Sequence, residues 1–211
     1  MAKERKSARQ QAVSDLKRSL ILDAARKVFE ADGLDGASLR AIAGAAGYTP
    51  AALYFHFDSK EAIYAEVLRG SLVNLGTAVS RTALRGNTPA DRLRAAAMAF
   101  FRYYADNPRD LDLGFYLFRG GMKPHGLGKA RDEVLNAALE LALQPIAEAT
   151  VALGARRAEA KLLVADIFAH AAGLLLLAHT GRIRIFGASA QNLMERFVET
   201  AVAALPGRPG K

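Results

Sequence analysis

The sequence predicts an all-α protein, in which a short N-terminal three-helix unit precedes a larger helical region. Alanine and leucine dominate, glycine and proline gather at a few breaks, and no stretch alternates between apolar and polar residues for long enough to form a sheet. The 211 residues can bury a hydrophobic core, and the lack of cysteine excludes disulfides, thiolate zinc sites and cysteine nucleophiles.

The first helix is expected to begin near Lys17, after a basic segment. Apolar residues then recur at helical spacing as far as Phe29, and Gly33 and Gly36 end the pattern. Residues 1–16 have a basic excess without the apolar run of a signal peptide, so we predict a flexible basic arm and a cytoplasmic protein. The net charge of +8 fits a polyanionic partner. The basic arm either contacts that partner or is a solvated tail without such a contact.

Two short helices follow, separated by a glycine turn. Ser38 is placed to cap the first helix, and Gly47 stands where a left-handed residue ends it. Thr49 precedes the second helix, with Pro50 at the first helical position, where a missing N–H costs nothing. This layout is that of a helix-turn-helix.

A long helix is predicted from Ser59 into the 80s, with Asp58 as its N-cap and Glu61 completing a capping box. Thr88 caps the next helix, which extends to about residue 105. Further helices are expected at residues 109–119, 128–153, 157–180 and 189–205, with loops at 120–126 and across "GRIRIFG". These elements divide the chain into a basic arm (1–16), a helix-turn-helix domain (17–62), a helical domain (63–205) and a flexible tail (206–211).

The second short helix leaves small and aromatic side chains outside. If Leu53 faces inward, a rotation of about 100° per residue gives the outward arc Ala51, Ala52, Tyr54 and Phe55. Small residues allow close approach to a groove wall, and alanine or phenyl groups suit the methyl group of thymine. The helix has no Arg, Asn, Gln or Lys, so base reading would be sparse and would depend on methyl contacts and DNA shape. The alternative is that the aromatic block fills a three-helix core.

The segment "SLRAIAGAAGYTPAALYFHFDSKEAI" resembles the DNA-binding signature of TetR-type transcriptional repressors, and "ILDAARKVFEADGLDGAS" resembles their first helix and the turn after it. The resemblance extends over about residues 18–65 and depends on the glycine turn, the "LYxHF" block and the "SKEA" helix start. It implies that Tyr54 and His56 contact phosphates, Phe55 meets the groove and Phe57 turns inward as core. The DNA-binding candidates are Ser38, Arg40, Thr49, Pro50, Ala51, Ala52, Tyr54, Phe55, His56 and Lys60.

Seven aromatic residues fall between positions 100 and 118. They form ordinary core, or part of the cluster lines an apolar cavity with tyrosine hydroxyls and a histidine as polar groups. Asp166 and His170 stand four apart on one helix but lack a third ligand at metal-binding spacing, so we predict no metal and no cofactor. The candidates for an effector pocket are Phe101, Tyr104, Phe115, Tyr116, Phe118, His125, Asp166 and His170.

The last two long helices carry wide apolar stripes at spacings of three and four residues. One monomer would not cover both stripes, which predicts an isologous four-helix interface between two copies. The longest apolar run, residues 169–181, is shorter than the roughly 18 residues of a membrane span, so we expect a buried helix and no membrane partner. The interface candidates are Leu163, Ile167, Ala171, Leu174, Leu175, Leu193, Phe197 and Ala201.

These features and the resemblance imply a homodimeric repressor. A small apolar or amphipathic effector would release it from a pseudo-palindromic, double-stranded operator. The alternative is a dimeric DNA-binding regulator that needs no effector. An all-helical enzyme with an apolar pocket is the third reading, but the sequence has no nucleophile elbow, Gly-rich phosphate loop or metal spacing, so we predict that the protein is not an enzyme.

Overall fold

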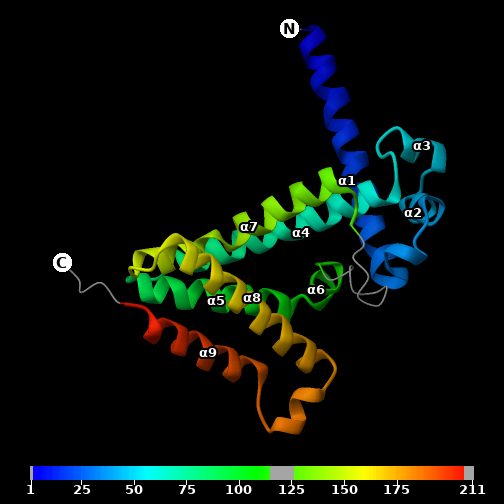
Figure 1. Ribbon diagram of the computed structural model, residues 1–211. Coiled ribbons are helices and arrows are strands. Elements are labelled where there is room, and N and C mark those ends of the chain that lie inside the picture. The colour runs from blue at the N-terminus through cyan, green and yellow to red at the C-terminus, as the bar shows by residue number, and fades with distance from the viewer. Residues whose placement is uncertain (1, 115–125, 207–211) are drawn as a thin grey trace. The chain divides into compact units, whose positions relative to one another are not determined.

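Every regular element in the described part of the chain is helical, which confirms the all-α fold class. The computed structural model describes residues 2–114 and 126–206 (Figure 1). Residues 120–125 of the predicted loop 120–126, residues 115–119 of the predicted helix 109–119, and all of the predicted tail after residue 206 lie outside these ranges. The elements are α1 (Ala2–Gly36), α2 (Leu39–Ala46), α3 (Pro50–Tyr54), α4 (Lys60–Ala83), α5 (Pro89–Asp106), α6 (Pro108–Gly114), α7 (Lys129–Ala152), α8 (Arg157–His179), the 3₁₀ helix η2 (Arg182–Phe186) and α9 (Ala190–Ala204).

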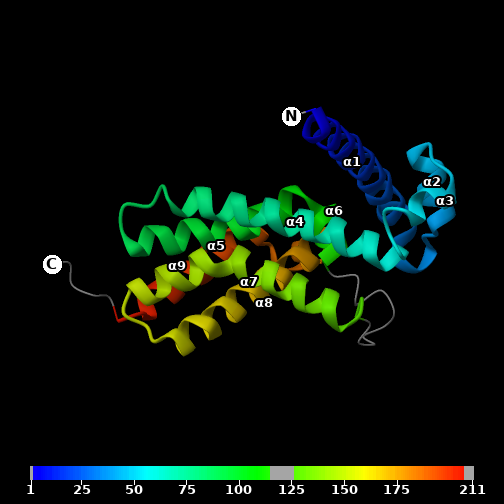
Figure 2. The same ribbon diagram turned by 90° about the horizontal axis from the view of Figure 1, so that it is seen from above.

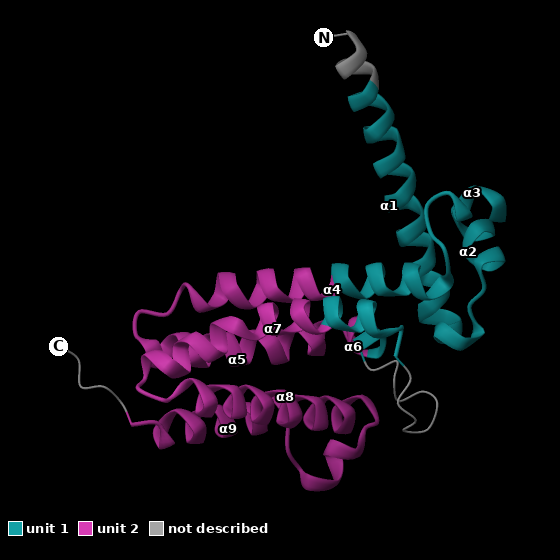
Figure 3. Cartoon of the chain, turned by 45° about the horizontal axis from the view of Figure 1, so that its top comes forward, with its two compact units in different colours: residues 1–70, 112–135 teal, residues 71–111, 136–211 magenta. Residues whose placement is uncertain are grey.

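The chain divides into two compact units (Figure 3). Unit 1 holds the residues up to Gly70 together with Asp112–Leu135, and unit 2 holds Ser71–Leu111 together with the residues from Asn136 onward. Helices α4 and α7 therefore each contribute their first residues to unit 1 and their later residues to unit 2. This division falls later in α4 than the predicted domain boundary at residue 62.

The start of α4 belongs to unit 1 because its side chains fill that unit's core. Tyr64 packs edge-on against Phe29 of α1, with ring centroids 4.8 Å apart. Its hydroxyl donates a 2.8 Å hydrogen bond to the Leu113 carbonyl, which satisfies the one polar atom of a buried ring.

Helix α1 begins at Ala2, so the prediction of a flexible arm over residues 1–16 is wrong for the described residues. This segment contains Ala, Glu, Arg, Lys and Gln, which are strong helix formers, and no Gly or Pro interrupts it. Ile21, Ala25 and Phe29 form its buried side. Gly33 has a φ of 69°, in the left-handed region, and kinks the helix three residues before it ends.

Helix α4 has a different cap from the predicted one. The Ser59 hydroxyl accepts a 3.1 Å hydrogen bond from the Ala62 N–H, so Ser59 is the N-cap. The carboxylate of Asp58, which we predicted to cap this helix, is instead bound by Arg131 at the start of α7, at 3.1 Å from both oxygens.

Unit 2 is a bundle in which α5, α8 and α9 pack against one another (Figures 1 and 2). The predicted Thr88 cap is confirmed, and Asp91 completes a capping box with it. Phe100 of α5 is 2% exposed and lies 5.6 Å from the Phe168 ring of α8. The "GRIRIFG" segment is not an irregular loop, because residues 182–186 form η2.

Candidate nucleic-acid interface

The turn between α2 and α3 is built by the local signals that the sequence predicts. The Ser38 hydroxyl accepts a 3.1 Å hydrogen bond from the Ala41 N–H at the start of α2. Gly47 ends α2 with a φ of 73°, where a side chain would be strained. The Thr49 hydroxyl accepts a 3.3 Å hydrogen bond from the Ala52 N–H, and Pro50 begins α3. These contacts fix α3 as a short helix after a sharp turn.

Helix α3 is anchored by one fully buried side chain and exposes most of the others. Leu53 is 0% exposed, whereas Tyr54 is 60% and Phe55 is 89% exposed. Phe57, just after the helix, is 4% exposed, which confirms that it turns inward. The alternative in which the whole aromatic block is core is therefore wrong for Tyr54 and Phe55. We define the exposed α3 face as Thr49, Pro50, Ala51, Tyr54 and Phe55; Ala52 and His56 are half-buried, and Arg40 of α2 is exposed.

Arg18 of α1 holds the turn that follows α3. One of its N–H groups donates a 2.9 Å hydrogen bond to the His56 carbonyl, and the Nε group donates a 3.1 Å bond to Glu66 of α4. The guanidinium carbon lies 4.3 Å from the centroid of the Phe57 ring. A planar cation can satisfy a carbonyl, a carboxylate and an aromatic face at once, so Arg18 ties three segments of unit 1 together.

Lys60 does not point to solvent as a phosphate donor would. Its ammonium group donates to the carbonyls of Leu34 at 2.9 Å, Asp35 at 3.2 Å and Ala37 at 3.2 Å. An ammonium has three N–H donors, and all three are used at the C-terminal end of α1, where a cation is favoured by the helix dipole. Lys60 is thus a structural tie in unit 1, and its predicted role as a phosphate contact does not fit this geometry.

Sequence reasoning missed Arg18, Glu66 and Arg131 as supports of the helix-turn-helix. Arg18 and Glu66 are separated by 48 positions, and Arg131 lies 73 positions after Asp58. No local pattern announces such a pair. The sequence shows only that Arg18 and Glu66 are charged residues close to the apolar positions of their helices.

The predicted pocket residues that the structure describes differ in their surroundings. Phe101 and Tyr104 are 3% and 5% exposed and belong to the core of unit 2, and burial raises the pKa of the Tyr104 hydroxyl. His170 stacks on Phe197, with ring centroids 4.1 Å apart, and its Nε2 atom is buried without a hydrogen-bond partner. Asp166 is exposed on α8. The remaining candidates lie outside the described residues: Phe115, Tyr116, Phe118 and His125.

Half of the predicted interface residues are buried within one chain. Ile167 and Ala171 are 0% exposed, Leu174 is 6% and Leu175 is 2% exposed, so they form the core of unit 2 and cannot meet a second copy. The other candidates are half-buried: Leu163, Leu193, Phe197 and Ala201.

Helix α8 turns a second apolar side outward. It has 23 residues, which by length and composition is enough to cross a membrane, and 22% of its most apolar window is buried. The expectation of a fully buried helix was therefore wrong. We define the α8 stripe as the exposed residues Leu162, Ala165, Ala169, Gly173 and Leu176, beside which lies the exposed Asp166.

No group of three or more His, Asp or Glu side chains that could hold a metal ion occurs in residues 2–114 and 126–206. The described part of unit 1 offers instead a helix-turn-helix whose second helix exposes Tyr54 and Phe55. An arrangement of this kind is typical of DNA-binding proteins.

Comparison with known proteins agrees with this class. Residues 21–67 match the family model described as bacterial regulatory proteins, tetR family. The HTH-type transcriptional repressor KstR2 of Rhodococcus jostii is 46% identical over 59 residues, 28% of this chain and 29% of the relative. The HTH-type transcriptional activator FasR of Mycolicibacterium smegmatis is 42% identical over 90 residues, 42% of this chain and 41% of the relative. The match to the TetR family of transcriptional regulators thus covers residues 21–67, and the relatives named here are regulators by their names.

The fold of the whole chain also has solved counterparts. The transcriptional regulator FadR from Bacillus subtilis, in complex with stearoyl-CoA, aligns with a TM-score of 0.67 and 16% identity over 89% of this chain and 98% of that chain. The two curated matches span less than half the length of each relative. Sequence similarity to those relatives is thus a property of one part of the chain, whereas the fold is shared over most of it.

Proposed function

We propose that the protein is a homodimeric repressor that binds a pseudo-palindromic operator through the exposed α3 face. The observation that carries this proposal is the pair Tyr54 and Phe55, 60% and 89% exposed on a helix with one anchoring residue. Large aromatic side chains are seldom left so open unless they meet a partner. Ala51, also exposed, would let the helix backbone approach the groove wall, and Phe55 would contact thymine methyl groups.

The remaining DNA candidates have secondary roles in this proposal. Tyr54 and His56 would donate to phosphates, which position the protein without reading sequence. Arg40 on α2 is exposed, and its side chain is capable of a bidentate base contact. Lys60 is left out, because its ammonium is fully engaged by three carbonyls.

A dimer would use the α8 stripe rather than the buried positions. Leu162 and Leu176 are 68% and 63% exposed at the ends of the stripe, and Ala165, Ala169 and Gly173 between them present little side chain. Small residues let two helices cross closely, and the same stripe on each copy makes the contact self-complementary. Two copies then present two α3 faces to half-sites about one helical turn apart.

An effector would act by changing the spacing of the two α3 faces. Helix α4 starts next to the turn after α3 and continues into unit 2 as one helix, so it is suited to transmit a shift. Coupling of this kind is typically about 1 to 3 kcal/mol. The solved structure of FadR from Bacillus subtilis with stearoyl-CoA makes acyl-CoA compounds one class to screen, and an effector-free regulator is the second candidate.

Selection of bound fragments from random double-stranded DNA tests the proposal. We expect a pseudo-palindrome, and Ala51→Glu should weaken its binding by at least about 100-fold because a carboxylate would face the phosphates. Ala31→Glu, an equal change of charge at an exposed position of α1, is the matched control and should leave most of the affinity. Normal binding by Ala51→Glu would show that α3 does not enter the groove.

The dimer has its own test. Light scattering should give twice the chain mass for the parent protein and a single mass for Leu176→Arg. Leu84→Arg is the control, because Leu84 is 80% exposed but lies outside the α8 stripe. A parent protein that is monomeric at micromolar concentration would contradict the dimer.

A further inference from the structure

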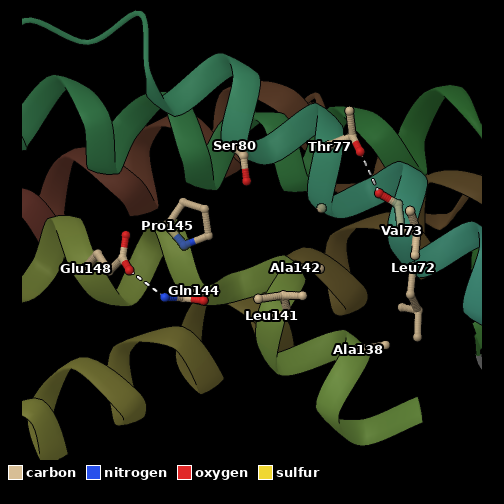
Figure 4. A pocket seen from close by; sticks show the side chains of 11 residues that line it. Leu72, Val73, Thr77, Ser80, Ala138, Leu141, Ala142, Gln144, Pro145 and Glu148 are labelled. Atoms are coloured by element: carbon tan, nitrogen blue, oxygen red, sulfur yellow. Dashed lines mark hydrogen bonds between the residues drawn. The ribbon is translucent and has the colours of Figure 1, made fainter. Parts of the chain in front are cut away.

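A surface groove between α4 and α7 lies within unit 2 and is distinct from the predicted pocket (Figure 4). Its volume is about 540 Å³, in the range of sites for small molecules. Gly76 forms part of its floor, where a side chain would lie 3.3 Å from the Ala142 backbone, so the two helices approach closely beneath the groove. The lining residues are Leu72, Val73, Gly76, Thr77, Ser80, Ala138, Leu141, Ala142, Gln144, Pro145 and Glu148.

One end of the groove is apolar and open to solvent. Val73 is 53% and Leu141 is 68% exposed, although both are large hydrophobic residues, and Leu72 between the helices is 6% exposed. Figure 4 shows Leu72 and Val73 on the side where Ala138 lies, and Leu141 nearer the middle of the groove. An aliphatic chain placed here would cover surface that unit 2 leaves in water.

The other end offers hydrogen-bond acceptors and a negative charge. Pro145 has no N–H, so the Leu141 carbonyl one turn earlier lacks its usual helical donor. Glu148 is the only charged residue among those that line the groove. At this end Gln144 donates to Glu148 at 2.5 Å. At the Val73 end the Thr77 hydroxyl donates to the Val73 carbonyl at 2.9 Å. The Glu148 carboxylate therefore favours a ligand head group that supplies protons and positive charge.

We propose that this groove binds a small cationic amphiphile, a primary amine on an aliphatic chain. The chain would lie against Leu72, Val73 and Leu141, and the ammonium would donate to Glu148, to the Leu141 carbonyl that Pro145 cannot bond, and to Ser80. A carboxylate head group is disfavoured, because it would meet the like charge of Glu148. The inference rests on the proposed effector function, for which it names the ligand class.

The test compares three probes with one chain length and different head groups. Calorimetric titration of the full chain with decylamine, 1-decanol and decanoate, each below its micelle concentration, should show decylamine binding at least about tenfold tighter than decanoate. Glu148→Gln should remove most of that preference. Glu140→Gln, an equal loss of charge at an exposed α7 position that does not line the groove, should retain it.

Two further variants separate the head-group site from the apolar end. Pro145→Ala restores the missing N–H, so it should weaken decylamine binding without lowering the melting temperature. Leu141→Asn should weaken decylamine and decanol by similar factors, and its fold should persist because Leu141 is 68% exposed.

Several outcomes would overturn the proposal. Decanoate or decanoyl-CoA binding as tightly as decylamine would exclude a cationic preference, and a Glu148→Gln variant with unchanged preference would exclude this groove as the site. Conversion of a dimer to a monomer by Leu141→Asn would mean that a second copy covers the groove.

Operator affinity is measured separately. Decylamine binding with no change in operator affinity would overturn the effector role, whereas a chain that binds no DNA fragment would contradict the proposed function itself.

Discussion

Different kinds of contact stabilise the inside of each unit. In unit 1, three basic side chains bridge segments that are far apart in the sequence: Arg18 joins α1 to Glu66 and the His56 carbonyl, Lys60 binds three carbonyls at the end of α1, and Arg131 binds Asp58. We call these three contacts the basic ties. Each is directional, so each sets the orientation of a segment as well as its distance.

Unit 2 relies on apolar packing. Ile146, Ile167 and Met194 are 0% exposed, from α7, α8 and α9 respectively. An ion pair between α5 and α9, Arg94 with Glu199 at 2.8 Å, has side chains that are 37% and 58% exposed. Exposed pairs of this kind contribute little to stability.

This difference explains why the sequence of one part of the chain matches a family model while the rest does not. A helix as short as α3, with one buried side chain, cannot be aimed by packing alone, so its surroundings need particular donors at particular places. A helical bundle needs only apolar residues of suitable volume, and many sequences supply them. The family-model match to residues 21–67 lies wholly inside unit 1, the unit whose directional contacts require particular residues.

The largest effect should come from the anchor of α3. Leu53→Ala should lower the free energy of unfolding by about 2–5 kcal/mol, because it leaves a cavity under a helix with no second buried residue. Ile167→Ala, also 0% exposed, should cost a similar amount in unit 2. Hydrogen exchange followed by mass spectrometry should then show faster exchange confined to residues 39–66 for Leu53→Ala. Equal acceleration in both units would mean that they unfold together and would remove the distinction between them.

A second prediction concerns the central basic tie. Arg18→Ala should cost about 1.5–3 kcal/mol, because Arg18 and Glu66 are only 36% and 29% exposed and the carboxylate would lose its partner. Arg18→Lys should recover part of this energy but not the contact with the His56 carbonyl, since an ammonium lacks the guanidinium's planar geometry. Chemical denaturation monitored by circular dichroism measures both. If Arg18→Ala and the surface variant Arg94→Ala lower the free energy of unfolding by the same amount, the basic ties would not distinguish unit 1 from unit 2.

The sequence predicted what is encoded locally. Ser38, Gly47, Thr49 and Pro50 act within three or four positions of themselves, so their roles could be assigned without knowing the fold. Asp58 shows how narrow that success is, because the adjacent Ser59 is an equally good cap and only the distant Arg131 decides between them.

Contacts between distant segments were beyond reach. Lys60 has the residue type and position of a phosphate contact, and nothing in its neighbourhood indicates that the α1 carbonyls take all three of its donors. The prediction of the buried side of α8 failed for another reason. This helix is apolar nearly all round, so periodicity alone could not show whether the side of Ile167 or the side of Leu176 faces the core.

A third prediction distinguishes a basic tie from a DNA contact. Lys60→Ala should lower stability by about 1–2 kcal/mol, because the carbonyls at the end of α1 lose a cation. The slope of log affinity against log salt should not change for binding to the selected operator. A slope reduced by about one unit would mean that Lys60 releases its carbonyls and contacts a phosphate when DNA is bound. Lys60→Arg, which keeps the charge, is the control.

The smallest effect belongs to the surface of unit 2. A hydrogen bond from the Thr88 hydroxyl, 2.7 Å long, lowers the pKa of Asp91 below its ordinary value of 3.8, and the Thr88 N–H adds to the shift. Because the pKa is lower in the folded state, the capping box contributes stability that is fully present above pH 3.8 and is lost as the pH falls through the folded-state pKa. In Thr88→Val, a carboxyl-detected NMR titration should place the pKa of Asp91 closer to 3.8, while the parent and the variant differ in melting temperature at neutral pH and converge in acid. An unchanged Asp91 titration in Thr88→Val would contradict this assignment, and would mean that Arg94, 3.6 Å away, holds the carboxylate instead.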